Sequence, residues 1–145
     1  MCLMLYIAAD QEIAEHTRGP VTIQAIDDKV AANLALVFTK PHRGLVSVDG
    51  GCSCDFPSFP RSVDYFDGIF HEDSKKERPK AVNCTQSLLS LVAEAAESSG
   101  SVELFPTWAG HEGRPPKGRM DLRAHDVVPE EFFFVEWFVY EMRSG

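Results

Sequence analysis

Apolar runs and alternating patterns predict a β-sheet. Residues 3–9 are apolar on both faces, as in a central strand that is covered on two sides. Residues 21–26 alternate and are rich in β-branched side chains, which predicts a second strand. A third strand is expected at residues 45–48 and a fourth at residues 102–105, where Pro106 ends it.

The C-terminal third of the chain predicts two more strands. Met120 and Leu122 alternate with charged residues, as in an edge strand. Residues 132–142 are apolar on both faces, and their aromatic and β-branched content favours one long strand. A buried helix is the alternative for this last segment.

Two segments show helical periodicity. Asp27 or Asp28 is expected to cap a helix that runs to about residue 38. A second helix is expected to begin near Asn83 and to stop at Gly100. The pattern therefore predicts one α+β domain over residues 1–145. Its sheet would be mixed and mostly antiparallel, with about five to six strands and two main helices.

Periodicity is lost between residues 55 and 82. Prolines interrupt residues 56–60, and residues 71–80 are a run of mixed charge. Structureless segments of this length are uncommon inside compact domains and are often lids, binding loops or insertions. We therefore expect a long loop or insertion over residues 55–82, with its charged half in solvent.

Charge and hydropathy exclude some partners. The chain has 14 Lys and Arg against 22 Asp and Glu, a net charge of −8, whereas non-specific nucleic-acid binding needs a basic surface. No segment approaches the ~20 apolar residues that span a bilayer. The N-terminus also lacks the basic start of a signal peptide. We expect a cytoplasmic protein that binds neither nucleic acid nor membrane.

Three of the four cysteines could form one site. Cys52 and Cys54 follow two glycines, and thiols at i and i+2 of an extended backbone point to the same side. Such a pair chelates a soft or borderline metal, zinc or iron, or acts as a redox dithiol. The usual zinc pair has a wider spacing, which counts against the metal. Cys2 starts the central strand and Cys52 follows another strand, so Cys2 is a candidate third ligand.

The fourth ligand would come from His42, His111 or Glu112. An imidazole would complete a structural zinc site, and a carboxylate at an open position would suit a catalytic one. The alternative for Cys2 is a small buried apolar residue. If Met1 is removed, Cys2 could also be an N-terminal nucleophile beside its own α-amine.

Two other features have weaker chemical interpretations. Cys84 would lie at a helix start, where the helix dipole lowers the pKa of a thiol. No histidine or second thiol stands nearby in sequence, which favours a helix-start residue without a chemical role. Arg114, Lys117 and Arg119 form a basic patch that could bind a phosphate or carboxylate. A solvated surface loop is the alternative interpretation of this patch.

Several blocks of the sequence form a recognisable set: MCLMLYIA at the start, FTKPH, GCSC, VELFPTWAGHE and, more weakly, PEEFFF. In these blocks the chain resembles a family of small uncharacterised bacterial proteins. Its members usually carry glycine where this chain has Asp55. The resemblance implies a grouping and no mechanism.

Two functions follow as hypotheses. The first is a metal- or thiol-dependent site formed by Cys2, Cys52 and Cys54 and completed by His111 or Glu112. The second is an acidic interaction or regulatory module, without catalysis, whose negative surface meets a basic protein partner. Convergence of the three sulfurs would favour the first hypothesis.

Overall fold

A seven-stranded mixed sheet organises the protein. The computed structural model describes all residues except 1–2, 54–55, 57, 60–70, 133 and 145, and for 58–59 and 71–78 it describes the backbone alone. The strands are β1 (Leu3–Ala9), β2 (Thr17–Arg18), β3 (Val21–Ala25), β4 (His42–Val48), β5 (Ser58–Phe59), β6 (Ser101–Trp108), β7 (Gly118–Arg123), β8 (Phe134–Val135) and β9 (Phe138–Arg143). The helices are α1 (Asp28–Leu34), α3 (His71–Ser99) and the short 3₁₀ helix η1 (Ala124–Asp126).

The order of the large sheet is β2-β3-β4-β1-β6-β9-β7, so β1 lies at its centre. All its neighbouring strands run antiparallel except β7 and β9, which are parallel. Strands β5 and β8 form a separate parallel pair. The predicted α+β class and mostly antiparallel sheet are confirmed, with seven strands in place of five to six.

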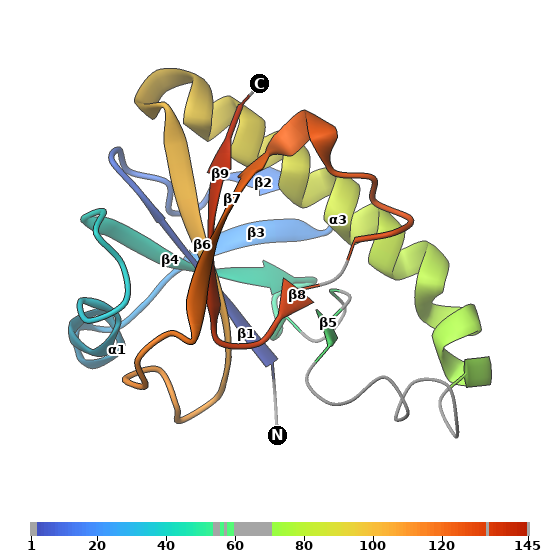
Figure 1. Ribbon diagram of the computed structural model, residues 1–145, viewed down its shortest axis with the longest axis horizontal. Coiled ribbons are helices and arrows are strands. Elements are labelled where there is room, and N and C mark those ends of the chain that lie inside the picture. Colours follow the sequence, from blue (N-terminus) through green and yellow to red (C-terminus); the bar gives the residue numbers. More distant parts are fainter. Residues whose placement is uncertain (1–2, 54–55, 57, 60–70, 133, 145) are drawn as a thin grey trace.

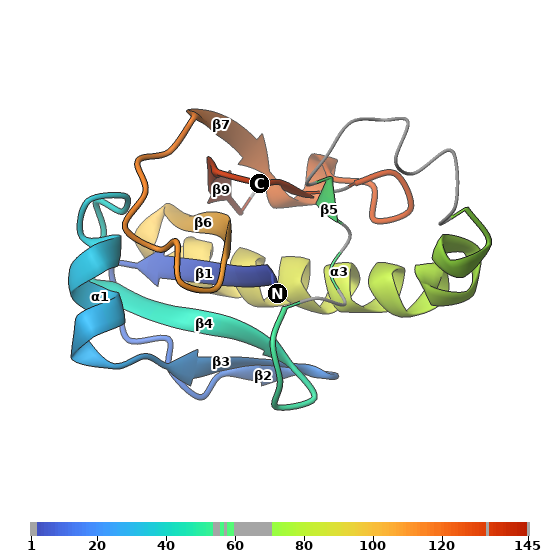
Figure 2. The same cartoon turned by 90° about the horizontal axis from the view of Figure 1, so that it is seen from below.

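The two main helices cover opposite faces of the large sheet (Figures 1 and 2). Leu88 and Val92 of α3 pack in the larger core with Leu5 and Ile7 of β1. The smaller core lies on the other face, where Leu34 of α1 packs among neighbouring apolar side chains. The sides of β1 alternate between these cores, which explains why the whole strand is apolar. The remaining members of the smaller core are Tyr6, Ala8, Val37, Phe38, Phe105, Trp137 and Val139.

Helix α1 is shorter than predicted. The Asp27 side chain caps it by accepting a hydrogen bond from Val30 N at 2.8 Å. The regular helix ends at Leu34, and Val37 N and Phe38 N both donate to Leu34 O in a turn. Val37 and Phe38 are buried in the smaller core, which accounts for the helical spacing of apolar residues beyond the helix end.

Helix α3 begins earlier than predicted, so part of the expected loop is helical. It starts at His71 and contains Pro79, and residues 71–82 therefore belong to a helix. Asn83 is an interior position, and so is Cys84, which is fully buried in the larger core. The expected position of Cys84 at a helix start is wrong, and the dipole argument for a reactive thiol no longer applies, because the N-terminal dipole acts only over the first turn. None of the helices that the structure describes is both long and apolar enough to cross a membrane.

Pro106 does not end its strand, because β6 continues to Trp108. The Pro106 carbonyl accepts from Trp137 N at 2.8 Å, so it points away from β1. In a strand, the N–H and C=O groups of one residue point to the same side. The N–H that proline lacks would therefore also point away from β1, and its absence leaves the hydrogen bonds between β6 and β1 intact.

The predicted long strand over residues 132–142 is interrupted. A turn at Glu136 and Trp137 separates β8 from β9. Trp137 has a φ of 69°, a left-handed conformation in which a strand cannot continue. The helical alternative for this segment is wrong. The predicted edge strand around Met120 and Leu122 is confirmed as β7.

Candidate functional site

Three of the segments proposed to form a site meet at one end of the sheet. Strand β1 begins there, since Leu3 pairs with Trp108 at the end of β6. Strand β4 ends beside it, because Leu5 pairs with Val46 and the strand stops two residues later. The chain therefore brings the segment after β4, the segment after β6 and the start of β1 to a common edge.

Ser53 fixes the segment after β4 to this edge. It is fully buried, and its backbone N–H donates to Leu3 O at 3.1 Å. Its hydroxyl accepts from Leu5 N at 2.8 Å and donates to Val46 O. Ser53 thus takes the place of a ladder hydrogen bond between β1 and β4 where these strands separate. The Gly-Cys-Ser-Cys motif is therefore anchored to the central strand through Ser53, the residue between the two cysteines.

Cys52 is half-buried, and its carbonyl accepts from Val48 N at 3.3 Å. Cys2 and Cys54 lie outside the described residues. In the sequence, Cys2 precedes Leu3 and Cys54 follows Ser53, the two residues that a backbone hydrogen bond joins. Within the described part of the chain, no three His, Cys, Asp or Glu side chains gather in a geometry that could hold a metal. Convergence of the three sulfurs therefore stays a prediction.

Glu112 is turned toward the α1 face of the sheet. Its Oε1 accepts from the Tyr6 hydroxyl at 3.0 Å and from Gly110 N at 3.2 Å. Burial raises the pKa of Tyr6 well above its usual range, and the Glu112 carboxylate and Asp27 raise it further. Tyr6 is therefore held as a neutral hydrogen-bond donor, which makes it a poor general base.

His111 stacks on Trp137. The ring centroids are 5.9 Å apart with an interplanar angle of 21°. The guanidinium of Arg114 lies over the same indole, 5.4 Å from its centroid. The His111 Nδ1 is buried and has no hydrogen-bond partner among the described residues. The loop after β6 thus closes over the smaller core and leaves one imidazole nitrogen uncommitted.

The three predicted anion-binding residues have separate surroundings. Arg114 lies on Trp137, whereas the Lys117 backbone N–H donates to Trp137 O at 2.7 Å. Arg119 donates to the buried Glu103 carboxylate at 3.0 Å and lies 3.7 Å from Glu141. Two carboxylates already neutralise Arg119, so it is a weak candidate for an external anion.

Glu103 is a buried anchor that was not among the predicted site residues. Its Oε1 accepts from Thr39 N at 2.9 Å, from the Thr39 hydroxyl at 3.1 Å and from Lys40 N at 3.0 Å. Its other oxygen accepts from Arg119. A fully buried carboxylate needs several donors of this kind. Glu103 therefore ties the turn before β4 to β6 and β7.

His42 lies at the far end of β4 from Cys52. It opens the strand, pairs with Ala9 at the end of β1, and has its Nδ1 3.7 Å from Glu12. Seven residues of strand at ~3.3 Å each separate the two ends by about 20 Å. His42 therefore cannot complete a site at Cys52.

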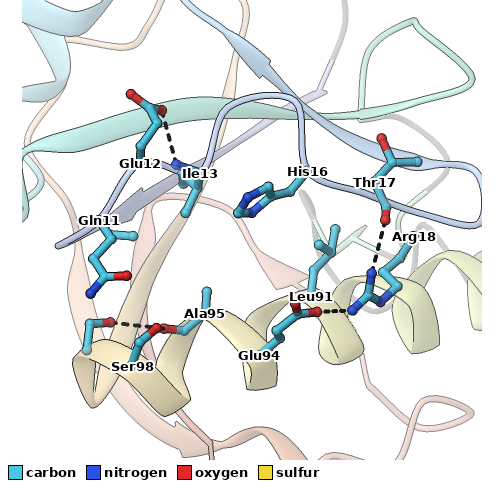
Figure 3. A pocket seen from close by; sticks show the side chains of 12 residues that line it. Gln11, Glu12, Ile13, His16, Thr17, Arg18, Leu91, Glu94, Ala95 and Ser98 are labelled. Carbon is cyan, nitrogen blue, oxygen red and sulfur yellow. Dashed lines mark hydrogen bonds and ion pairs between the residues drawn. The ribbon is translucent and has the colours of Figure 1, made fainter.

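A cleft of about 190 Å³ opens between the loop before β2 and the C-terminal half of α3 (Figure 3). Leu91 and Ala95 are among its apolar lining residues, and the His16 imidazole points into it. Many of its polar groups are bonded internally. Arg18 pairs with Glu94, and the Ser98 and Ser99 hydroxyls donate to Ala95 O.

In the same loop, Glu12 Oε1 accepts from the backbone N–H groups of Ile13 and Ala14 at 3.1 and 2.9 Å. The Ala14 hydrogen bond is the main reason why the pKa of Glu12 is lowered. Glu12 therefore shapes the loop that forms one wall of the cleft. The cleft has few uncommitted groups with which to select a ligand.

Sequence reasoning missed four residues that organise these regions: Ser53, Glu103, Tyr6 and Trp137. Each is buried, and the side chain of each has partners distant in sequence. A signal was present for Glu103, as an acidic residue within an otherwise apolar strand pattern. Its partners, however, come from turns that only the fold brings near.

Comparison with known proteins identifies no relative. The chain matches no protein-family model, no curated protein and no solved structure at a significant level.

Proposed function

We propose that the protein acts through a cysteine-centred site at the end of the sheet where β1 begins. In this proposal Cys2, Cys52 and Cys54 bind a soft or borderline metal ion, zinc or iron. The observation that supports it most is the double attachment of Ser53 to β1, through Leu3 O and Leu5 N.

This attachment favours a preorganised site. Cys52 and Cys54 flank a fully buried residue whose backbone and side chain are both hydrogen-bonded. Two thiols on either side of a fixed residue lose little conformational freedom when they bind a metal. Cys2 directly precedes Leu3, so the three cysteines belong to two chain segments that hydrogen-bond to each other.

His111 is our preferred fourth ligand. Its buried Nδ1 has no hydrogen-bond partner among the described residues, whereas Glu112 already accepts two hydrogen bonds through Oε1. A neutral imidazole with three thiolates is a common structural zinc set. The expected cytoplasmic setting would keep the thiols reduced and available for the metal.

Elemental analysis of protein purified without added metal tests the proposal. We expect close to one equivalent of zinc or iron per chain, with most of it lost in Cys52→Ser and Cys54→Ser. Cys84→Ser is the matched control. Cys84 lies in the middle of α3 and packs in the larger core, so its replacement should not change the metal content.

The thiols provide the second readout. A metal-free protein in which Cys52 and Cys54 react faster than a model thiol would favour the redox dithiol instead. A metal-free protein with ordinary thiol reactivity would exclude both forms of the site.

A further inference from the structure

We propose that the groove beside β7 binds an extended, basic segment of a partner protein, which joins the large sheet as an additional strand. This interaction surface is independent of the proposed cysteine site. It would make the protein a recognition module as well.

The groove is open and largely apolar. It has a volume of about 380 Å³ and lies between β7 and the segment that follows η1. Met120 is 40% exposed and Val128 is 48% exposed, and both line it. Only one other large hydrophobic residue in the described part of the chain, Leu36, is comparably exposed. Its other lining residues are Leu122, Asp126, Val127, Glu131, Phe132, Val135 and Tyr140.

Strand β7, which lines this groove together with Tyr140 of β9, has an open outer edge in the described part of the chain. It is the last strand of the large sheet, and no described strand pairs with its outer side (Figure 2). The unpaired backbone groups of an edge strand are a template for another strand. Met120 and Leu122 stand on the groove face of β7, so apolar side chains at alternate positions of an added strand would lie beside them.

The charge around the groove selects a basic occupant. The charged lining residues are Asp126 and Glu131, and neither has an ion-pair partner among the described residues. Strand alternation puts Arg119 and Arg123 on the other face of β7, and Arg119 is held there by Glu103. Lysine or arginine beside the apolar positions of the partner would meet these carboxylates.

A second copy of this chain fits the groove less well. Each copy has a net charge of −8, and pairing two β7 edges would bring their unpaired carboxylates together. The exposed apolar side chains and the two carboxylates of the groove therefore favour a partner segment that alternates apolar and basic residues.

Fluorescence polarisation with a labelled peptide tests this. The probe is a peptide of about nine residues that alternates valine and lysine, a length that covers β7 with a short overhang. We expect saturable binding to the full-length protein. We expect no binding by the matching valine–glutamate peptide, or by a valine–lysine peptide with N-methylated backbone amides on one edge.

Two groove variants and one control with the same change in charge locate the surface. Met120→Lys removes an apolar contact and repels the basic peptide, so it should weaken binding at least ~10-fold, and Val128→Lys is a second, independent groove variant with the same expectation. Leu36→Lys, the control, also adds one positive charge at an exposed apolar residue, outside the groove, and should leave the affinity unchanged. Circular dichroism and urea midpoints confirm that each variant is folded.

Three results would overturn the proposal. Binding that is as strong in Met120→Lys and Val128→Lys as in Leu36→Lys would indicate attraction to the acidic surface in general. Equal binding of the N-methylated peptide would exclude strand addition. A dimer of the peptide-free protein that dissociates in Met120→Lys would make a second copy the occupant of the groove.

Discussion

At the scale of single residues, buried polar groups join distant segments of the chain. The Ser53 hydroxyl stands between β1 and β4, and the Glu103 carboxylate gathers backbone and side-chain donors from the turn before β4. Each is fully buried, so its hydrogen bonds have no water to replace them. Such hydrogen bonds fix a single loop conformation, and those of Ser53 are the reason why we place the cysteine motif at the start of β1.

Replacing Ser53 with alanine should destabilise the protein. The change removes an acceptor from Leu5 N and a donor from Val46 O, both inside the sheet, and should lower the free energy of unfolding by about 1–3 kcal/mol. Urea denaturation measures the loss. Ser98→Ala is the control, because Ser98 is exposed at the end of α3 and should change stability little. Equal effects in the two variants would mean that Ser53 does not hold β1 and β4 together.

The raised pKa of Tyr6 predicts that the folded protein loses stability at alkaline pH. In the unfolded chain its phenol ionises near pH ~10, whereas burial and the Glu112 carboxylate raise the pKa of Tyr6 in the folded protein. The folded state therefore keeps a proton that the unfolded state releases. The stabilisation is complete below pH ~10 and is lost as the pH rises above it.

Tyr6→Phe should reduce this alkaline loss. Urea midpoints between pH 8 and pH 11, about the range that spans the unfolded pKa, measure it. The variant should be slightly less stable than wild type at pH ~8, because it lacks the hydrogen bond to Glu112, and should decline less above pH ~10. Burial also raises the pKa of Tyr140, so some decline should remain. Parallel curves for the two proteins would contradict the role given to Tyr6.

At the scale of elements, local pattern predicted the apolar strands best. The strand at residues 3–9 could be predicted because it is buried along nearly its whole length, and the edge strand around Met120 because apolar and charged residues alternate along it. The start of α3 could not, because a mixed-charge run with a proline resembles a loop unless tertiary contacts extend the helix. The break at Trp137 also depends on a non-local contact, its N–H donating to Pro106 O.

The packing of β3 on β4 depends on Gly44. A Cβ at this buried position would lie 2.7 Å from Ile23 Cγ2 and 3.0 Å from Gln24 O. Gly44→Ala should therefore lower the free energy of unfolding by about 1–3 kcal/mol. Thermal and urea denaturation measure it, with Gly51→Ala as control, since a Cβ there meets only Val48 O at 3.5 Å. An unchanged stability of Gly44→Ala would show that the strands can separate at no cost.

At the scale of the whole molecule, one sheet presents two separate regions. The segment with Cys52 attaches to the end of the central strand β1. The groove is lined by β7, which is one of the two edge strands of the sheet (Figure 2). Sequence reasoning placed Cys52 at a strand end from the apolar run before it, and that placement agrees with the fold. The groove could not be predicted, because its walls come from β7, η1, the segment after η1, β8 and β9, and only the fold assembles them.

The net charge of −8 is reflected in the residues that line the groove. Around the groove the charged lining residues are acidic, whereas Arg119 is neutralised by Glu103 and Glu141 on the other face. Two residues of the predicted basic patch have internal contacts: Arg114 lies over Trp137, and Arg119 pairs with Glu103 and Glu141. These contacts involve residues distant in sequence, so the spacing of the basic residues could not reveal them.

The central claim is that Cys52 and Cys54 belong to one metal site, and a Co²⁺ titration under reducing, anaerobic conditions tests it most directly. Thiolates bound to Co²⁺ give an intense charge-transfer absorption. We expect this band to saturate at about one equivalent of Co²⁺ per chain and to be lost in Cys52→Ser and Cys54→Ser, but retained in Cys84→Ser. No band in the wild-type protein, or an equal band in Cys52→Ser, would contradict the claim.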